Sequence, residues 1–197
     1  MLDLYAKIYI VVFGVAFIVA LVYSFGKFYI SQKYFNKNCL RLYEESLKSY
    51  AFSIDDNVEQ IAKKMNKTIK YKKIKTEAFI DEQNPDVINV NERLSDEKKN
   101  FAVTHELGHM LRGYDSKAAR DRKNVFSRLS PEEQICDYYA AAILLPKADL
   151  KRKMDEARYN TLNEDSQADF VREIAEEKCV VDDVVYRRIS EINMLYS

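Results

Sequence analysis

The stretch that decides the fold is FAVTHELGH (residues 101–109), in which Glu106 follows His105 and precedes His109. These two histidines are the only ones in the chain of 197 residues. Residues four apart share one face of a helix, so both imidazoles can reach a single metal ion with Glu106 beside it. The pattern therefore predicts a helix over residues 95–112 that carries a metal site.

Zinc suits this motif, because two neutral imidazoles and a carboxylate leave the fourth position of a tetrahedral ion open to water. A zinc ion lowers the pKa of bound water to about 7, and a neighbouring Glu can then act as general base. The motif predicts His105 and His109 as metal ligands and Glu106 as the catalytic base.

The third ligand is expected on the next helix, which begins at Ser130-Pro131 and ends before Pro146. Glu133 and Asp137 share one face of it, so Glu133 could ligate the metal while Asp137 orients a histidine from behind. However, Ser130-Pro-Glu-Glu133 is also a capping box, in which Glu133 reaches back to its own helix terminus. Spacing alone leaves both roles open.

Residues 54–189 resemble the ImmA/IrrE family of zinc metallopeptidases. The family's Asn-containing strand, HELGH helix and following Glu-bearing helix correspond to VINVN (87–91), FAVTHELGH (101–109) and EQICDYYAAAILLP (133–146), and IAEEKCVVDDVVYRRI (174–189) is similar to its C-terminal tail. The sequence departs from the family pattern at Cys136, Asp137, Tyr139, Leu145 and Val181. The resemblance implies that Glu133 is the metal ligand. It also implies that the substrate is a regulatory protein, typically a helix-turn-helix repressor of a phage, mobile element or stress response.

The predicted fold class is α+β, a small zincin-like (gluzincin-type) domain with a short sheet packed on several helices. Hydrophobic periodicity predicts helices over 53–67, 147–159, 164–178 and 182–195, a strand over 68–74, and a hairpin from 77–81 and 87–91. Asp55 and Asp56 suit the start of the first of these helices. In zincins generally, an edge strand holds an extended substrate beside the metal, and strand 87–91 is a candidate for that edge.

One transmembrane helix is predicted before this domain, because residues 8–26 contain no charged side chain. Nineteen helical residues span roughly 28 Å, about the thickness of the hydrocarbon core. Positive charge follows the span, which places the remaining chain in the cytoplasm. The predicted organisation is an anchor at 1–30, a juxtamembrane linker or helix at 31–52, the zinc metallopeptidase domain at 53–160 and a C-terminal helical tail at 161–197.

The composition of the chain bears on its binding partners and on the compartment in which it works. Lys+Arg and Asp+Glu both total 31, which disfavours direct nucleic-acid binding. The three cysteines form no C-x-x-C pair, as expected in a reducing compartment. Cys136 is more readily a small buried helix residue than a redox switch.

The sequence does not identify the residue that would stabilise the oxyanion. An oxyanion-stabilising donor could be a tyrosine, and the candidates are Tyr114, Tyr138 and Tyr139, none of which is assigned.

The expected function is that of a membrane-anchored zinc metallo-endopeptidase with a protein substrate. The alternatives are a regulatory binding module that does not cut its partner, and an extracytoplasmic protease if the topology is reversed. The substrate's identity, the trigger and the oligomeric state are not encoded in any motif.

Overall fold

The computed structural model describes residues 36–112 and 131–197. Within the chain, Leu40–Ser197 forms one compact unit, separate from Met1–Cys39. The predicted membrane span (8–26) and Tyr114 lie outside the described residues. In the two ranges that are described, none of the helices combines the length and apolar character needed to cross a bilayer.

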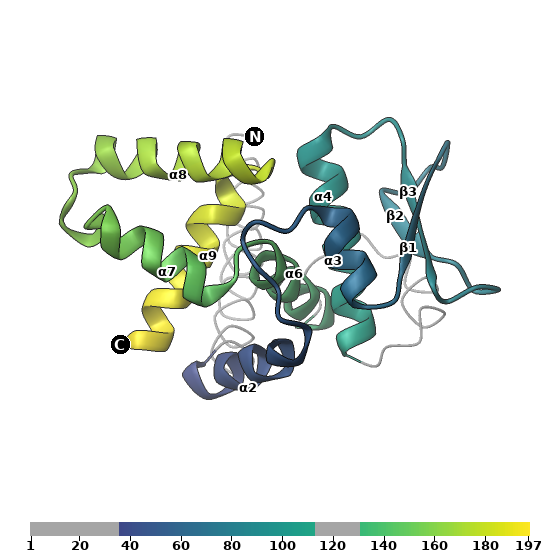
Figure 1. The fold of residues 1–197 in the computed structure, drawn as a ribbon, viewed down its shortest axis with the longest axis horizontal. Helices are drawn as coiled ribbons and strands as arrows, with labels where there is room; N and C mark the ends of the chain where they lie inside the picture. Colours follow the sequence, from purple (N-terminus) through teal and green to yellow (C-terminus); the bar gives the residue numbers. More distant parts are fainter. Residues whose placement is uncertain (1–35, 113–130) are drawn as a thin grey trace, which may run out of the picture. The chain divides into compact units, whose positions relative to one another are not determined.

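A three-stranded sheet forms one side of the compact unit (Figure 1). Its strands are β1 (Thr68–Lys72), β2 (Ala78–Ile80) and β3 (Val87–Asn91), in the order β1-β3-β2. β2 and β3 pair antiparallel, as the predicted hairpin requires, whereas β1 and β3 pair parallel.

Strand 87–91, the candidate edge strand, is not at an edge of the sheet. β3 has a hydrogen-bonded partner on each side, and its first four residues are buried. Parallel pairing needs a long connection between the strands, and the segment that contains β2 provides it, folding back against the far side of β3. The two edge strands of the sheet are β1 and β2.

Helix α4 (Asp96–Leu111) lies between the sheet and α6 (Pro131–Leu144) (Figure 1). The packing of α4 on α6 is the most extensive between any two described elements. Both helices match their predicted ranges closely, and the chain leaves α6 at Leu145-Pro146, where proline was expected to stop it.

The N-terminal helices show one difference from the sequence prediction. Helix α2 (Lys37–Leu47) continues into a 3-10 turn (Lys48–Tyr50), but α3 (Val58–Lys64) begins later than expected. Asn57 caps α3 in a reciprocal capping box with Gln60. The carboxylate of Asp56 instead accepts a hydrogen bond from Ser53 N (2.7 Å), closing the turn before the helix.

The C-terminal part consists of α7 (Lys147–Glu156), a 3-10 turn (Tyr159–Thr161), α8 (Glu164–Lys178) and α9 (Asp182–Tyr196). Helix α9 packs on α6, α7 and α8. Because α9 contacts the same helix, α6, that faces α4, side chains of α9 can reach the back of the predicted metal site.

The mixed α+β class is confirmed: a three-stranded sheet is packed on helices. The division into a peptidase domain ending at 160 and a tail beginning at 161 stays a prediction, as does the anchor.

Candidate metal centre

The two histidines of α4 face α6 because the helices approach each other closely at Gly108. A Cβ built on Gly108 would lie 2.9 Å from the Cys136 carbonyl oxygen and 3.2 Å from the Tyr139 Cβ. Glycine costs about 1 kcal/mol inside a helix, and this close approach is the packing reason for that cost. It brings the first two turns of α6 against His105 and His109.

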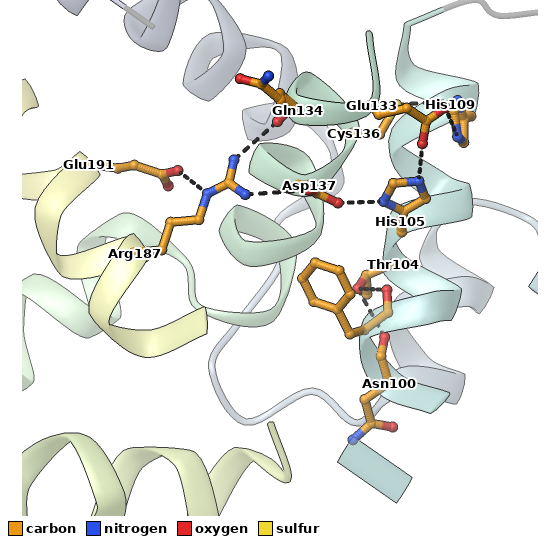
Figure 2. Close-up of polar contacts among 11 residues, drawn as sticks. Asn100, Thr104, His105, His109, Glu133, Gln134, Cys136, Asp137, Arg187 and Glu191 are labelled. Atoms are coloured by element: carbon orange, nitrogen blue, oxygen red, sulfur yellow. Dashed lines mark hydrogen bonds and ion pairs between the residues drawn. The ribbon is translucent and has the colours of Figure 1, made fainter. Parts of the chain in front are cut away.

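The carboxylate of Glu133 lies between the two imidazoles (Figure 2). Its Oε2 is 3.1 Å from His105 Nε2, and its Oε1 is 3.7 Å from His109 Nε2. Of the two roles that spacing left open, this is the position that a metal ligand requires. Glu133 follows His109 by 24 positions in the sequence, and the fold brings it next to both histidines.

The donor set fits a zinc ion. One ligand atom from each of His105, His109 and Glu133 can be chosen so that all three lie within 4.8 Å of one another. Ligands bound tetrahedrally at about 2.0–2.2 Å would lie roughly 3.3–3.6 Å apart, so small side-chain adjustments suffice. Two imidazoles and a carboxylate are ligands that zinc accepts readily.

Asp137, for which the sequence predicts a role in orienting a histidine, lies next to His105. Its Oδ1 is 2.8 Å from His105 Nδ1, while Nε2 of the same ring faces Glu133. A hydrogen bond at Nδ1 fixes both the ring orientation and the tautomer that leaves Nε2 free to bind a metal.

His109 has a different partner at the corresponding ring atom. The Sγ of Cys136 lies 3.2 Å from His109 Nδ1. Cys136 is fully buried, as predicted, and burial raises the pKa of its thiol, so the thiol stays protonated at neutral pH. The contact with His109 was not anticipated, because only the packing of α4 on α6 reveals which residue faces Nδ1.

The electrostatics of these residues favour a proton on His105. Burial by itself lowers the pKa of His105, but the hydrogen bonds with Asp137 and Glu133 outweigh it and raise that pKa to about 10. The pKa of Glu133 is lowered, chiefly by its hydrogen bond with His105. Burial and the neighbouring charge of His105 lower the pKa of His109. One proton on His105 thus partly neutralises the two carboxylates.

A cleft of about 710 Å³ opens beside these residues. Glu106, the predicted base, lines it together with His105 and Glu133. The cleft is also lined by residues 75–78, which lead into the edge strand β2. The cleft therefore combines a metal-binding group, a carboxylate and a strand edge.

Tyr138 and Tyr139, two of the candidates for oxyanion stabilisation, are directed elsewhere. The hydroxyl of Tyr138 donates to Glu44 Oε1 (2.5 Å), and the hydroxyl of Tyr139 lies 3.1 Å from Ser46 Oγ. Both tyrosines are buried against α2, and burial raises the pKa of each. Neither lines the cleft.

Arg187 is a residue of this neighbourhood that the sequence did not reveal. Its guanidinium approaches Asp137 from α9 (Figure 2), with Nη1 3.5 Å from Oδ2. No local signal links it to Asp137, because the two residues are 50 positions apart.

Comparisons with known proteins identify a matching family model and a similar fold. The sequence model of the IrrE N-terminal-like domain matches residues 58–190. A solved structure of a Mycobacterium tuberculosis transcriptional regulator has a similar fold, with a TM-score of 0.58 at 14% sequence identity. That match covers 84% of this chain and 50% of the regulator, so the chain spans about half of that protein's length. No curated protein matches the chain.

Proposed function

The chain belongs to the IrrE N-terminal-like domain family, and on that basis we propose that it is a zinc-dependent metallo-endopeptidase. Proteins of this family are zinc-dependent in general. The observation that carries the proposal is the convergence of His105, His109 and Glu133 on one point at the side of a cleft that Glu106 also lines.

In this mechanism, His105, His109 and Glu133 would hold the zinc ion. The ion, when bound, supplies Lewis acidity toward the scissile carbonyl and lowers the pKa of water. Glu106 accepts a proton from the attacking water and later passes it to the leaving amine. Asp137 holds the His105 ring in the tautomer whose Nε2 is free to bind.

A polypeptide in extended conformation is the proposed substrate form. Among the strands of the described residues, β2 pairs with β3 alone, and the residues leading into β2 line the cleft. An extended segment can add to such an edge through main-chain hydrogen bonds, which brings its backbone past the metal-binding residues. By analogy with the family, the substrate would be a helix-turn-helix repressor, whose cleavage relieves repression.

We further propose that residues 1–30 anchor the protein in a membrane, with the catalytic domain on the cytoplasmic side. The support is the uncharged sequence of residues 8–26 and the cations that follow it. An impermeant thiol reagent applied to intact cells tests the topology. Cys179 is the suitable reporter because it is partly exposed, whereas Cys136 is buried. Protection of Cys179 supports the cytoplasmic arrangement, and labelling supports the reversed one.

The enzymatic proposal is tested on the full chain. Wild type should contain one zinc per chain and cleave a helix-turn-helix repressor encoded near it. Glu106→Gln should retain zinc and lose cleavage, because the amide cannot accept the proton. Glu173→Gln, an exposed change on α8, serves as the control.

Two outcomes would contradict this mechanism. Full activity of Glu106→Gln would exclude Glu106 as the base. A folded wild-type chain that binds no zinc would favour the regulatory binding module instead.

A further inference from the structure

We propose that Arg187 is a positioning residue of the metal centre, acting through Asp137 on His105. The inference rests on the proposed function, because it assigns a role relative to the metal ligands of that site. It extends the site from the two helices α4 and α6 to a third helix, α9.

The residues form a continuous chain of contacts across three helices (Figure 2). His105 Nδ1 is 2.8 Å from Asp137 Oδ1, and the other oxygen, Oδ2, is 3.5 Å from Arg187 Nη1. The two oxygens of Asp137 are thus divided between the imidazole and the guanidinium. A carboxylate held at both oxygens has little freedom to rotate, and its direction fixes that of the imidazole.

Arg187 is itself held rigidly enough to serve this role. Its Nη2 donates to the Gln134 carbonyl oxygen (3.0 Å), and its Nε donates to Glu191 Oε1 (2.9 Å). The planar guanidinium therefore faces three separate groups, donating hydrogen bonds to two of them and forming an ion pair with Asp137. A lysine ammonium keeps the charge but cannot reach all three acceptors in this geometry.

The role is one of geometry more than of stability. The side chains of Arg187 and Asp137 are 35% and 30% exposed, and ion pairs of this kind add little to folding free energy. Replacement of Arg187 should consequently leave the fold intact and loosen Asp137. Replacement of residues behind a metal ligand typically costs 10–100-fold in metal affinity.

A direct contact with substrate is the competing role for Arg187. The side chain also lines a pocket of about 320 Å³ with Phe101, a residue that lines the main cleft as well. A residue that only contacts substrate would alter KM and leave zinc affinity unchanged. Zinc affinity therefore distinguishes the two roles without any activity measurement.

The test measures zinc affinity of the full chain by competition with a chromophoric chelator. The variants are Arg187→Met, which keeps an unbranched stem, Asp137→Ala, the double variant and Arg187→Lys. Arg172→Met on α8 is the matched control, because Arg172 is exposed and pairs with the exposed Asp169.

We expect Arg187→Met to weaken zinc binding about tenfold, Arg187→Lys to recover part of this loss, and the control to match wild type. Because Arg187 acts through Asp137, the double variant should bind zinc as Asp137→Ala does. Wild-type affinity in Arg187→Met would overturn the proposal. Additive losses in the double variant would also overturn it, since they would mean that Arg187 acts independently of Asp137.

A second measurement needs no metal. In NMR spectra of the metal-free chain, wild type should show a slowly exchanging imidazole Nδ1 proton for His105, assigned by its loss in Asp137→Ala. Arg187→Met should broaden or lose this signal, and its persistence would overturn the proposal. If wild type binds no zinc, the proposed function fails, but this spectrum still decides whether Arg187 positions Asp137 and His105.

Discussion

Gly108 of α4 and Cys136 of α6 lie so close together that no side chain fits at position 108. A Cβ on Gly108 would stand 2.9 Å from the Cys136 carbonyl oxygen and 3.0 Å from its Cα. Both obstructing atoms belong to the backbone, so neither can move without shifting α6. This single contact sets the distance between the helix that carries His105 and His109 and the helix that carries Glu133.

Gly108→Ala should therefore destabilise the protein although alanine is the better helix former. The gain in helix propensity is about 1 kcal/mol, whereas overpacking typically costs about 1–3 kcal/mol. We expect a net loss of stability in urea denaturation, together with weaker zinc binding because Glu133 moves away from the imidazoles. A variant as stable as wild type with unchanged zinc affinity would show that α6 is not held at this contact.

Glu133→Ala should weaken zinc binding strongly while the fold is kept, because the side chain is only partly buried and its contacts are with the two histidines. Glu133→Gln is the stricter test, because it keeps the size and removes the charge. Glu132→Gln, one residue earlier on α6, is the control. Unchanged zinc affinity in Glu133→Gln would show that Glu133 is not a metal ligand and would favour its alternative role in capping the start of α6.

Zinc affinity should rise with pH. His105 has a pKa of about 10 in the metal-free site, so it carries a proton at pH 6–8, and zinc must displace that proton. The pKa of Glu133 is lowered, so this carboxylate is already ionised and adds no further dependence. One displaced proton corresponds to about a tenfold gain in affinity per pH unit. Chelator competition at pH 6, 7 and 8 measures the slope, and a flat profile would contradict the protonated state of His105.

The fully buried Arg188 should be important for stability. Its Nη2 donates to Glu44 Oε1 of α2 (2.6 Å) and its Nε to the Leu145 carbonyl oxygen (3.0 Å). Arg188→Met leaves Glu44 as a buried carboxylate without its main cation, which costs about 3–5 kcal/mol. Adding Glu44→Leu should recover much of this loss, because the stranded charge is removed. Equal denaturation midpoints for Arg188→Met and wild type would show that Arg188 does not stabilise the fold.

Val181→Ser should stabilise α9. Val181 occupies the N-cap with an extended backbone and provides no side-chain hydrogen bond to the helix. A serine hydroxyl can accept from a free N–H of the first turn, which is worth about 1 kcal/mol. Little packing is lost, because Val181 is 45% exposed. Val181→Ala, which lacks the hydroxyl, is the control, and both are compared in urea denaturation. A serine variant no more stable than the alanine variant would contradict the capping argument.

The local features of the fold were predicted well from the sequence. Helix α4 and helix α6 fall where the hydrophobic periodicity and the proline at 131 indicate, and the hairpin forms around the turn-rich segment 82–86. These elements depend on interactions between residues that are close in sequence. The start of α3 was predicted wrongly, because Asp55, Asp56 and Asn57 are all good N-cap residues and only Asn57 finds its reciprocal partner, Gln60.

In the candidate site too, the features that depend on neighbouring residues were predicted from the sequence. The four-residue spacing of His105 and His109 follows from helical geometry alone, so the sequence determined that both rings share a face, with Glu106 beside them. The sequence also determined the α+β class, through the periods of its apolar residues.

Only the tertiary structure decided which residues meet these side chains. It placed β3 at the centre of the sheet and β2 at its edge, turned Glu133 toward the imidazoles, and brought Arg187 from α9 to Asp137. Each of these relationships joins residues that are distant in sequence. Their formation depends on how helices and strands pack, which the local pattern of apolar and polar residues does not encode.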